Sequence, residues 1–256
     1  MDQAAHSIDC SDISLAHAGS DERVIDGISF RLERGAALIL VGSTGSGKST
    51  LAAVLAGQAD EGVHVVGGDA VVEGVSVRHG GRRRRALPVF AGYLGQQDGA
   101  QLAPRLTVAE IVAEPVTSRA RRVNARALEL RVVTLLDELG LSIGAASKFP
   151  YELSSGMRQR VAIARALVLD PRLVVADEPM ANLDVEGREL VRTAFEARRR
   201  DRGTSLLLVA NEAETLASFD ADVLVMQGGH AVGFGHGVTQ MQWTPSSSAD
   251  RRLVSS

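Results

Sequence analysis

GSTGSGKST at residues 42–50 follows directly on the apolar run AALILV at 36–41. A buried strand that ends in glycines and continues through Lys-Ser-Thr into an Ala- and Leu-rich helix is typical of a phosphate-binding P-loop. The glycines let backbone N–H groups surround phosphate oxygens, and the helix adds the positive end of its dipole. The alternative is a glycine-rich turn without a ligand, but strand, spacing and helix together favour binding of a nucleoside triphosphate.

Lys48 and Ser49 have the most specific predicted roles in this stretch. Lys48 can reach the β- and γ-phosphates, and Ser49 can offer its hydroxyl to Mg²⁺. The other predicted contacts to the nucleotide are Gly42, Ser43, Thr44, Gly45, Ser46, Gly47 and Thr50.

Composition excludes several other classes of protein. The 256 residues suffice for one sizeable α/β domain with an inserted subdomain. A formal net charge of −3 disfavours general nucleic-acid binding. Cys10 is the only cysteine, so we expect neither a disulfide framework nor a cysteine metal site, which fits a reducing compartment. The start of the chain is acidic and polar, unlike a signal peptide, and no apolar run approaches the ~20 residues of a membrane helix.

Residue patterning predicts an α/β fold, a P-loop NTPase (RecA-like) core with an N-terminal antiparallel β subdomain and an inserted helical subdomain. Strands are expected at 7–15, 24–33, 36–41, 63–77, 89–94, 172–177, 204–210 and 221–227. Helices are expected at 48–57, from Thr107, at 122–139, from near Ser154 to 169, at 186–200 and at 211–218. Thr107 and Glu110 form a capping box, and Gly140 stops the next helix.

Domain boundaries follow from this pattern. Residues 1–97 and 169–238 are assigned to the ATP-binding core with its antiparallel part, 98–168 to the helical subdomain, and 239–256 to a disordered tail low in apolar residues. The HGGRRRR run at 79–85 reads as a solvated loop, with a phosphate or lipid contact as the alternative.

A second part of the site is predicted where the strand LVVA at 173–176 ends in Asp177 and Glu178. Ligands of parallel α/β sheets lie at the carboxyl ends of the strands, so both acids should face the P-loop. We assign Asp177 to Mg²⁺ and Glu178 to the attacking water, which it can orient or deprotonate. The alternative is that these acids only cap the next helix.

The order of motifs resembles the ATPase subunit of ABC transporters. GSTGSGKST is followed by Gln97-Asp98, by LSSGMRQRVAIARAL (153–167), by LVVADEP (173–179) and by ANLD (181–184), and the match runs from residue 8 to about 235. Ser154 and Gly156 at a helix N-terminus make a second anion site. The resemblance implies that Ser154, Ser155, Gly156 and Asp184 meet ATP bound to the other subunit of a head-to-tail dimer.

The resemblance narrows to importers of oligopeptides, dipeptides and nickel or metal chelates through QLAPRLTVAEIVAEPV (101–116) and the methionine of LSSGM. It implies that Gln97 contacts Mg²⁺ and links the nucleotide to the helical subdomain. Gln96 has the same chemistry, but Gln97 directly precedes the acid. The implied partners are a second ATPase subunit, two transmembrane permease subunits and an extracytoplasmic substrate-binding protein, with no nucleic acid. The implied place is the cytoplasmic face of the cell membrane.

Three positions depart from the family pattern. Asn211 stands where the family has its switch histidine; asparagine can donate a hydrogen bond but cannot carry a proton, so we expect slower hydrolysis. Its alternative role is to cap a helix beginning at residue 212. His17 replaces the aromatic that stacks on adenine and offers less area, unless it is simply an exposed loop histidine. Ser155 adds a Cβ where the signature usually has glycine.

These departures predict an asymmetric pair in which this chain carries the weakened site and donates a serviceable signature to a different subunit. Two other hypotheses stay open. One is a soluble ABC ATPase of DNA repair, translation or cluster assembly, although this chain has neither a coiled-coil insertion nor a second cassette. The other is a degenerate subunit that binds ATP only as a clamp, which Asn211 favours and Glu178 disfavours.

Overall fold

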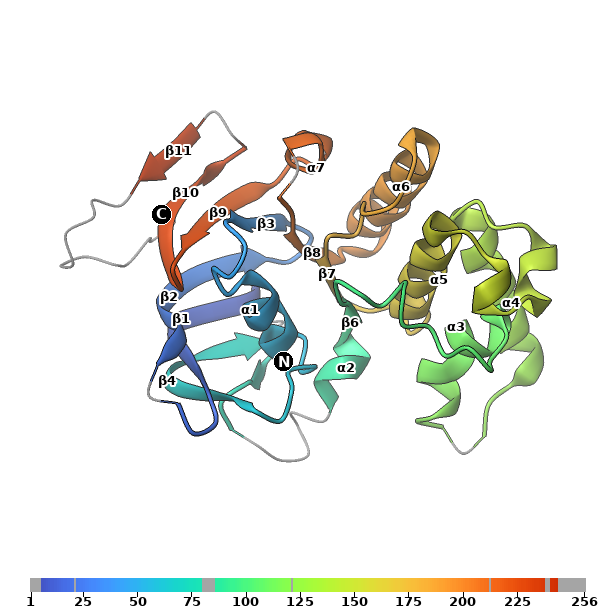
Figure 1. Cartoon of the computed structure of the whole chain (residues 1–256), viewed down its shortest axis with the longest axis horizontal. Helices are drawn as coiled ribbons and strands as arrows, with labels where there is room; N and C mark the ends of the chain where they lie inside the picture. The colour runs from blue at the N-terminus through green and yellow to red at the C-terminus, as the bar shows by residue number, and fades with distance from the viewer. Residues whose placement is uncertain are drawn as a thin grey trace.

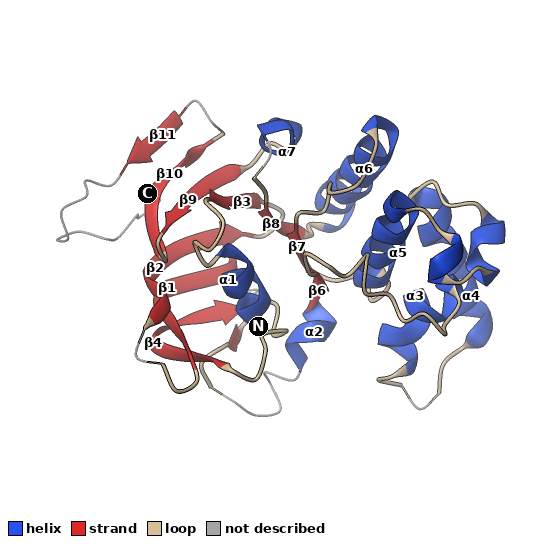
Figure 2. Cartoon of the chain, in the orientation of Figure 1, coloured by secondary structure: helices blue, strands red, loops and turns tan. Residues whose placement is uncertain are grey.

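The structure is a computed structural model that describes residues 6–20, 22–79, 86–120, 122–211, 213–237 and 240–243. The arginine run at 82–85 lies outside the described residues. Two sheets and a group of helices make up the fold (Figure 1, Figure 2). This arrangement confirms the predicted α/β class with an antiparallel β part.

The smaller sheet is antiparallel, in the order β2-β1-β4-β5. Its strands are β1 (His6–His17), β2 (Arg23–Glu33), β4 (Val63–Val72) and β5 (Val75–Ser76). Alternate residues of β2 are buried from Ile28 to Leu32, as expected where one face of a sheet covers a core, whereas β1 has a continuous buried run at 13–16, where its pairing shifts in register. Asp26-Gly27, a turn signal in the sequence, lies inside β2.

The larger sheet has the order β11-β10-β9-β3-β8-β7-β6, with β9, β3, β8, β7 and β6 parallel. Its strands are β3 (Ala37–Gly42), β6 (Ala91–Leu94), β7 (Leu173–Asp177), β8 (Ser205–Val209), β9 (Asp222–Gln227), β10 (His230–His236) and β11 (Gln240–Trp243). β3, β7 and β8 are nearly continuous apolar runs because parallel strands are covered on both faces.

Alternation along these strands divides the core in two. Leu38 and Leu40 of β3 face α1 (Lys48–Leu55), which packs between the two sheets (Figure 1). Ile39, between them, faces the opposite side, where α6 (Val185–Arg202) and the helical group lie. The P-loop helix is therefore held on one face of the sheet, and the helices that follow β6 are held on the other side of the molecule.

The helical group lies between β6 and β7 in the chain. It contains α3 (Val108–Thr117), α4 (Ala125–Glu138), η2 (Ile143–Ser147), η3 (Pro150–Glu152) and α5 (Ser155–Leu167). The capping box of Thr107 and Glu110 is confirmed, and Ser154 caps α5 through its Oγ. Gly140 follows α4 with a φ of 65°, a left-handed conformation that glycine adopts without strain. The boundaries of a separate subdomain at 98–168 stay a prediction.

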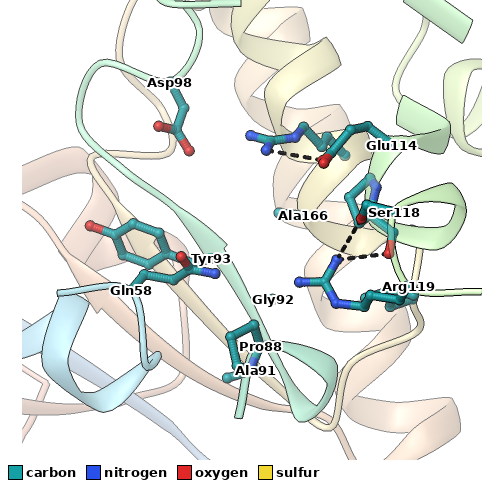
Figure 3. Close-up of a pocket in the computed structure, with 13 residues that line it drawn as sticks. Gln58, Pro88, Ala91, Gly92, Tyr93, Asp98, Glu114, Ser118, Arg119 and Ala166 are labelled. Atoms are coloured by element: carbon teal, nitrogen blue, oxygen red, sulfur yellow. Dashed lines mark hydrogen bonds and ion pairs between the residues drawn. The ribbon is translucent and has the colours of Figure 1, made fainter. Parts of the chain in front are cut away.

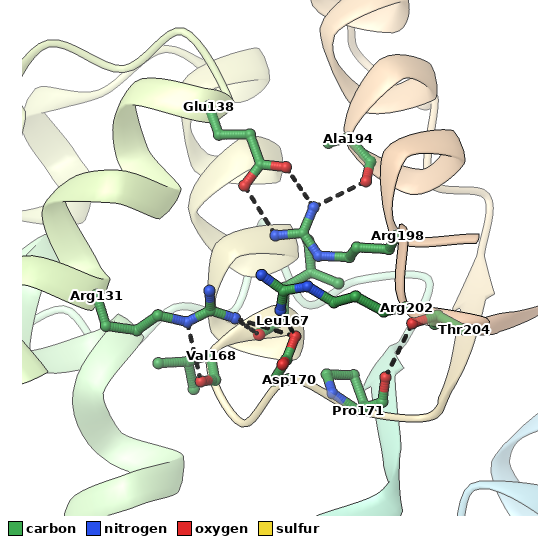
Figure 4. A network of polar contacts seen from close by, with 10 residues as sticks. All are labelled: Arg131, Glu138, Leu167, Val168, Asp170, Pro171, Ala194, Arg198, Arg202 and Thr204. Atoms are coloured by element: carbon green, nitrogen blue, oxygen red, sulfur yellow. Dashed lines mark hydrogen bonds and ion pairs between the residues drawn. The ribbon is translucent and has the colours of Figure 1, made fainter. Parts of the chain in front are cut away.

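A polar network ties α4 to α6 (Figure 4). Arg198 of α6 is 4% exposed and donates from Nη2 to Oε2 of Glu138 at 2.8 Å. Arg131 of α4 donates to the Leu167 carbonyl oxygen at 2.9 Å, and Arg202 of α6 pairs with Asp170. Because a buried guanidinium is costly without its partner, this network fixes the helical group against α6.

The structure corrects three sequence-based boundaries. Residues 89–90 belong to the short helix α2 (Leu87–Phe90), where Pro88 favours a first helical turn over a strand. Strands β10 and β11 were not predicted; glycines 228 and 229 form the turn before β10. β11 pairs with β10, so the tail predicted from residue 239 is wrong for residues 240–243, and 244–256 lie outside the described residues.

The remaining helix is α7 (Ala213–Ser218), between β8 and β9. Among the helices of the described residues, none has the length and apolar character that crossing a membrane requires.

Candidate nucleotide site

The P-loop connects the end of β3 to α1 through glycines in unusual conformations. Gly42 and Gly47 have φ values of 146° and 91°. A Cβ at Gly42 would lie 2.0 Å from the Met226 carbonyl oxygen, and one at Gly47 would lie 2.5 Å from Cδ1 of Ile25. No side chain caps α1, since Gly47 is its N-cap. The first N–H groups of this helix therefore have no side-chain acceptor and face a loop that only glycine can form.

The Lys48 side chain folds back along the P-loop. Its Nζ donates to the carbonyl oxygens of Gly42 at 2.7 Å and Ser43 at 3.0 Å, and to Oγ of Ser46 at 3.3 Å. The residue is 5% exposed, and burial lowers the pKa of the ammonium, although Asp177 and Glu178 partly offset this. A buried ammonium held only by neutral oxygens is suited to an anionic ligand.

Asp177 is the last residue of β7 and is 2% exposed. Burial raises the pKa of its carboxyl group, against a hydrogen bond with Ser49 that lowers it. Within the described residues its Oδ2 has no hydrogen-bond partner. A buried carboxylate oxygen without a partner beside a serine hydroxyl fits a hard divalent cation such as Mg²⁺. The predicted metal pair, Ser49 and Asp177, is therefore brought together.

Glu178 directly follows Asp177, and both its backbone N–H and its carboxylate make hydrogen bonds. Its φ of 49° is rare for a residue other than glycine. Its N–H donates to the Val209 carbonyl oxygen at 2.9 Å, and Oε1 accepts from Nδ2 of Asn211 at 2.8 Å. Asn211 thus lies beside Glu178, as its predicted role requires. Helix α7 begins at Ala213, and residue 212, where the capping hypothesis placed its start, lies outside the described residues.

The predicted signature residues lie together, in a second cluster. Ser154 is exposed and accepts the Met157 N–H at 3.2 Å, while Ser155 and Gly156 form the first turn of α5. A Cβ at Gly156 would lie 3.0 Å from the Asn182 carbonyl oxygen, so this turn packs on the loop before α6.

Asp184 ends that loop and caps α6, accepting the Gly187 N–H at 2.8 Å. In the described part of the chain, no hydrogen bond joins this cluster to the P-loop.

Two predicted contacts are not joined to the P-loop by hydrogen bonds among the described residues. Gln97 is exposed in the turn after β6, and its Oε1 accepts from Nε2 of Gln101 at 2.8 Å. His17 is exposed at the end of β1, opposite Val63 of β4. Their roles toward Mg²⁺ and adenine stay predictions.

A groove of about 360 Å³ separates β6 from the helical group (Figure 3). Tyr93 lines one wall, and burial raises the pKa of its hydroxyl to about 12. Across from it, Arg165 of α5 pairs with Glu114 of α3 at 3.3 Å, and Arg119 donates to the Pro115 carbonyl oxygen at 2.7 Å. The groove is therefore charged on the helical side and partly apolar on the other.

Sequence reasoning missed one buried polar residue near these sites, Gln159 of α5, which is 4% exposed. A signal for it exists, because Gln159 shares a helix face with the apolar residues Ala162 and Ile163, three and four positions later. An amide on a buried face needs hydrogen-bond partners.

Known proteins similar to this chain include a protein family and several curated relatives. A family model described as "ABC transporter" matches residues 25–181. The chain is 34% identical over 215 residues to the oligopeptide transport ATP-binding protein OppF of Escherichia coli (strain K12), covering 83% of this chain and 63% of that protein. It is 34% identical over 249 residues to OppD of Mycobacterium tuberculosis (strain ATCC 25618 / H37Rv), covering 94% of this chain and 39% of that protein. The chain thus spans less than two thirds of these relatives' length.

Among solved structures, a dimeric bacterial ABC transporter cassette is similar at a TM-score of 0.79 and 21% identity, covering 92% of this chain and 98% of that one. A dimeric ATP-binding cassette in a post-hydrolysis state, bound to ADP and Pi, gives a TM-score of 0.78 at 20% identity with the same coverage. At this identity, the likeness establishes the fold.

Proposed function

The chain belongs to the ABC transporter family, and we propose that it is an ATP-binding and hydrolysing subunit that powers an importer of peptides or metal chelates. It works in a dimer of ATPase subunits and carries the weaker of the two sites. The observation that carries this proposal is the hydrogen bond from Asn211 to Glu178, beside a complete P-loop.

Binding of ATP is assigned to the loop at 42–50. The phosphates replace the carbonyl oxygens that now accept from Lys48, so the ammonium exchanges neutral partners for anionic ones. The uncapped N–H groups at the start of α1 bind the same phosphates. The burial that lowers the pKa of Lys48 favours this exchange, because a ligand charge stabilises the ammonium.

Mg²⁺ is assigned to Ser49 and Asp177, with Gln97 as a further ligand. Bound there, the ion supplies positive charge that offsets charge on the phosphate oxygens. Asp177 contributes an ionised carboxylate, and the cost of burying that charge is reduced when a cation faces it.

Hydrolysis is assigned to Glu178, which orients the attacking water and accepts its proton. Asn211 holds the carboxylate through Oε1, and its amide cannot accept or carry that proton. Asn211 therefore fixes the direction of Glu178 but adds no acid–base chemistry. Losing such a group often slows hydrolysis by about 10²-fold.

The second cluster, at 154–156, is assigned to ATP held by the partner subunit. Ser154 and Ser155 are exposed, and among the described residues no hydrogen bond joins them to the chain's own P-loop. Asp184 adds a contact across the same interface. This chain would then donate an adequate signature to a stronger site on a different ATPase subunit.

Partners in the membrane are assigned to the groove between β6 and the helices (Figure 3). The turn that carries Gln97 leads from β6 into this helical side, and Asp98 of the same turn lines the groove. One permease subunit would insert a segment into this groove and the second into the partner ATPase, and an extracytoplasmic binding protein would deliver the cargo. The chain would then lie peripherally at the cytoplasmic face of the cell membrane.

The specific observation that favours a second function is again Asn211. A subunit that binds ATP and closes the dimer without hydrolysing it would need the P-loop and the signature but no switch histidine. In that case Glu178 would act only by its contact with Asn211.

The deciding experiment is the solution mass of Glu178→Gln with Mg-ATP, alone and mixed with candidate partner ATPases. This variant should retain ATP and trap a closed dimer. We expect a monomer alone and a heterodimer in the mixture. A homodimer, together with brisk hydrolysis by the wild-type chain alone, would contradict the asymmetric pair; closure with no hydrolysis in any wild-type pairing would favour the clamp.

A further inference from the structure

Gln159 is a buried amide in α5 that the functions above do not use. It lies three residues beyond Gly156 on the same helix, and its side chain is directed into the protein rather than toward solvent. An amide buried without partners costs roughly 1–3 kcal/mol, so its contacts explain why it is tolerated there.

The amide nitrogen contacts the backbone next to the proposed catalytic base. Nε2 donates to the carbonyl oxygen of Glu178 at 3.4 Å and to that of Pro179 at 3.3 Å. The Glu178 carbonyl oxygen also accepts the Ala181 N–H at 3.0 Å. Gln159 therefore binds the outer side of the turn that follows β7.

This turn needs such support. Glu178 has a positive φ of 49°, a conformation that persists in a non-glycine residue only when the surroundings hold it. β8 holds its N–H through the Val209 carbonyl oxygen, and Asn211 holds its carboxylate. Gln159 donates to the remaining backbone polar group of Glu178, its carbonyl oxygen. This hydrogen bond comes from the helical group.

The other side of Gln159 meets the turn after β6. A Cβ at Gly99 would lie 2.6 Å from Oε1 of Gln159 and 3.0 Å from its Cα, so this turn packs directly on α5 at that residue. The turn also contains Gln97, whose carbonyl oxygen accepts the N–H groups of Ala100 and Gln101. One side chain thus contacts both the turn at 97–101 and the backbone of Glu178.

We propose that Gln159 is a positioning residue that couples the helical group and the 97–101 turn to the direction of the Glu178 carboxylate. A displacement of α5 or of this turn moves the amide, and the amide moves the carbonyl of a residue in a strained conformation. The inference rests on the proposed role of Glu178. It adds that movement of the helical group or of the 97–101 turn changes the direction of the Glu178 carboxylate within the same chain.

The test compares Gln159→Met with a matched control, Gln227→Met, in the full chain. Methionine keeps the length of the side chain but removes the donor, whereas Gln227 is exposed at the end of β9. We expect Gln159→Met to lower kcat about tenfold with ATP affinity unchanged, since only the direction of the base is lost. Hydrolysis is measured in the pair with a partner ATPase that has been inactivated at its own catalytic base, so that only the site of this chain turns over, and nucleotide affinity is measured separately.

Hydrogen exchange gives a readout that does not depend on hydrolysis. In Gln159→Met the backbone N–H groups of Glu178 and of residues 180–183 should exchange faster, while those of β3 and of α5 stay as in the wild type; Pro179 has no N–H. Gln159→Glu adds a pH dependence: its carboxylate opposes two carbonyl oxygens, so lowering the pH should partly restore protection at 178–183.

The outcomes separate the inference from the proposed function. If exchange at 178–183 is unchanged, or if it accelerates throughout β3 and α5, Gln159 has no specific positioning role. Faster local exchange with unchanged kcat in an active pair would also overturn the coupling. If no wild-type pairing hydrolyses ATP, the proposed catalytic function fails, and the exchange data alone decide whether Gln159 positions the 178–181 turn.

Discussion

The N-terminus of α1 and the N-terminus of α5 both offer N–H groups to an anion, but they differ in what already occupies them. At α1 no side chain caps the helix, and Lys48 rests on loop carbonyls. At α5 the hydroxyl of Ser154 already accepts the Met157 N–H. The first end gains much from a phosphate, whereas at the second end the Ser154 hydroxyl already satisfies one of the N–H groups. This difference fits a site that binds ATP within one chain and a second site that acts only when a partner presents its nucleotide.

Lys48→Ala should have the largest effect, a loss of ATP affinity at the site beside the N-terminus of α1. Removing a buried cation that pairs with phosphate costs up to about 5 kcal/mol, so ATP affinity should fall by a hundredfold or more. The measurement is titration of the isolated chain with a fluorescent ATP analogue, with Ser154→Ala as the control. Equal losses in both variants would show that the two helix ends do not differ.

Gly47→Ala and Gly156→Ala form a matched pair for the same comparison. At Gly47 the φ of 91° and the 2.5 Å approach to Ile25 make a Cβ costly, and we expect a loss of about 2–3 kcal/mol in the free energy of unfolding. At Gly156 the added Cβ has no φ penalty and meets one carbonyl oxygen at 3.0 Å. That variant should fold nearly normally but pair poorly with a partner. Denaturant titration measures the loss of stability in Gly47→Ala, and solution mass measures how well Gly156→Ala pairs with a partner.

Asn211→His tests whether the α1 site limits hydrolysis. An imidazole can take part in proton transfer where the amide cannot, so hydrolysis at this site should rise about tenfold when the partner's own catalytic base has been inactivated. The measurement is phosphate release at saturating ATP, with ATP affinity as the control. An unchanged rate would show that Asn211 does not limit hydrolysis at this site.

Ser154→Ala should have the smallest effect on the chain alone. Loss of an N-cap costs about 1 kcal/mol, which a thermal unfolding scan detects as a fall of a few degrees in Tm. ATP affinity of the isolated chain should not change. If that affinity falls, the hydroxyl serves the chain's own nucleotide, and the assignment of this cluster to a partner is wrong.

Much of the fold was predictable because its signals are local. The P-loop, the capping box at Thr107 and the stop at Gly140 each depend on neighbouring residues, and the structure confirms them. Strands β10 and β11 were missed because their glycines and polar residues weaken the apolar pattern on which the prediction rests. Whether β10 forms a strand depends on its pairing with β9, and a short stretch of sequence does not reveal that pairing.

The sequence by itself singled out the groups that we propose to carry the chemistry: Lys48, Asp177, Glu178 and the asparagine at 211 are each readable from a short motif. Only the tertiary structure decided what each of them contacts. The Asn211 amide bonds the Glu178 carboxylate, and the Gln159 amide bonds the Glu178 carbonyl, although 33 and 19 positions separate these partners in the chain. The physical reason is that motif spacing follows from local backbone geometry, whereas these contacts depend on how β8 and α5 pack beside the end of β7.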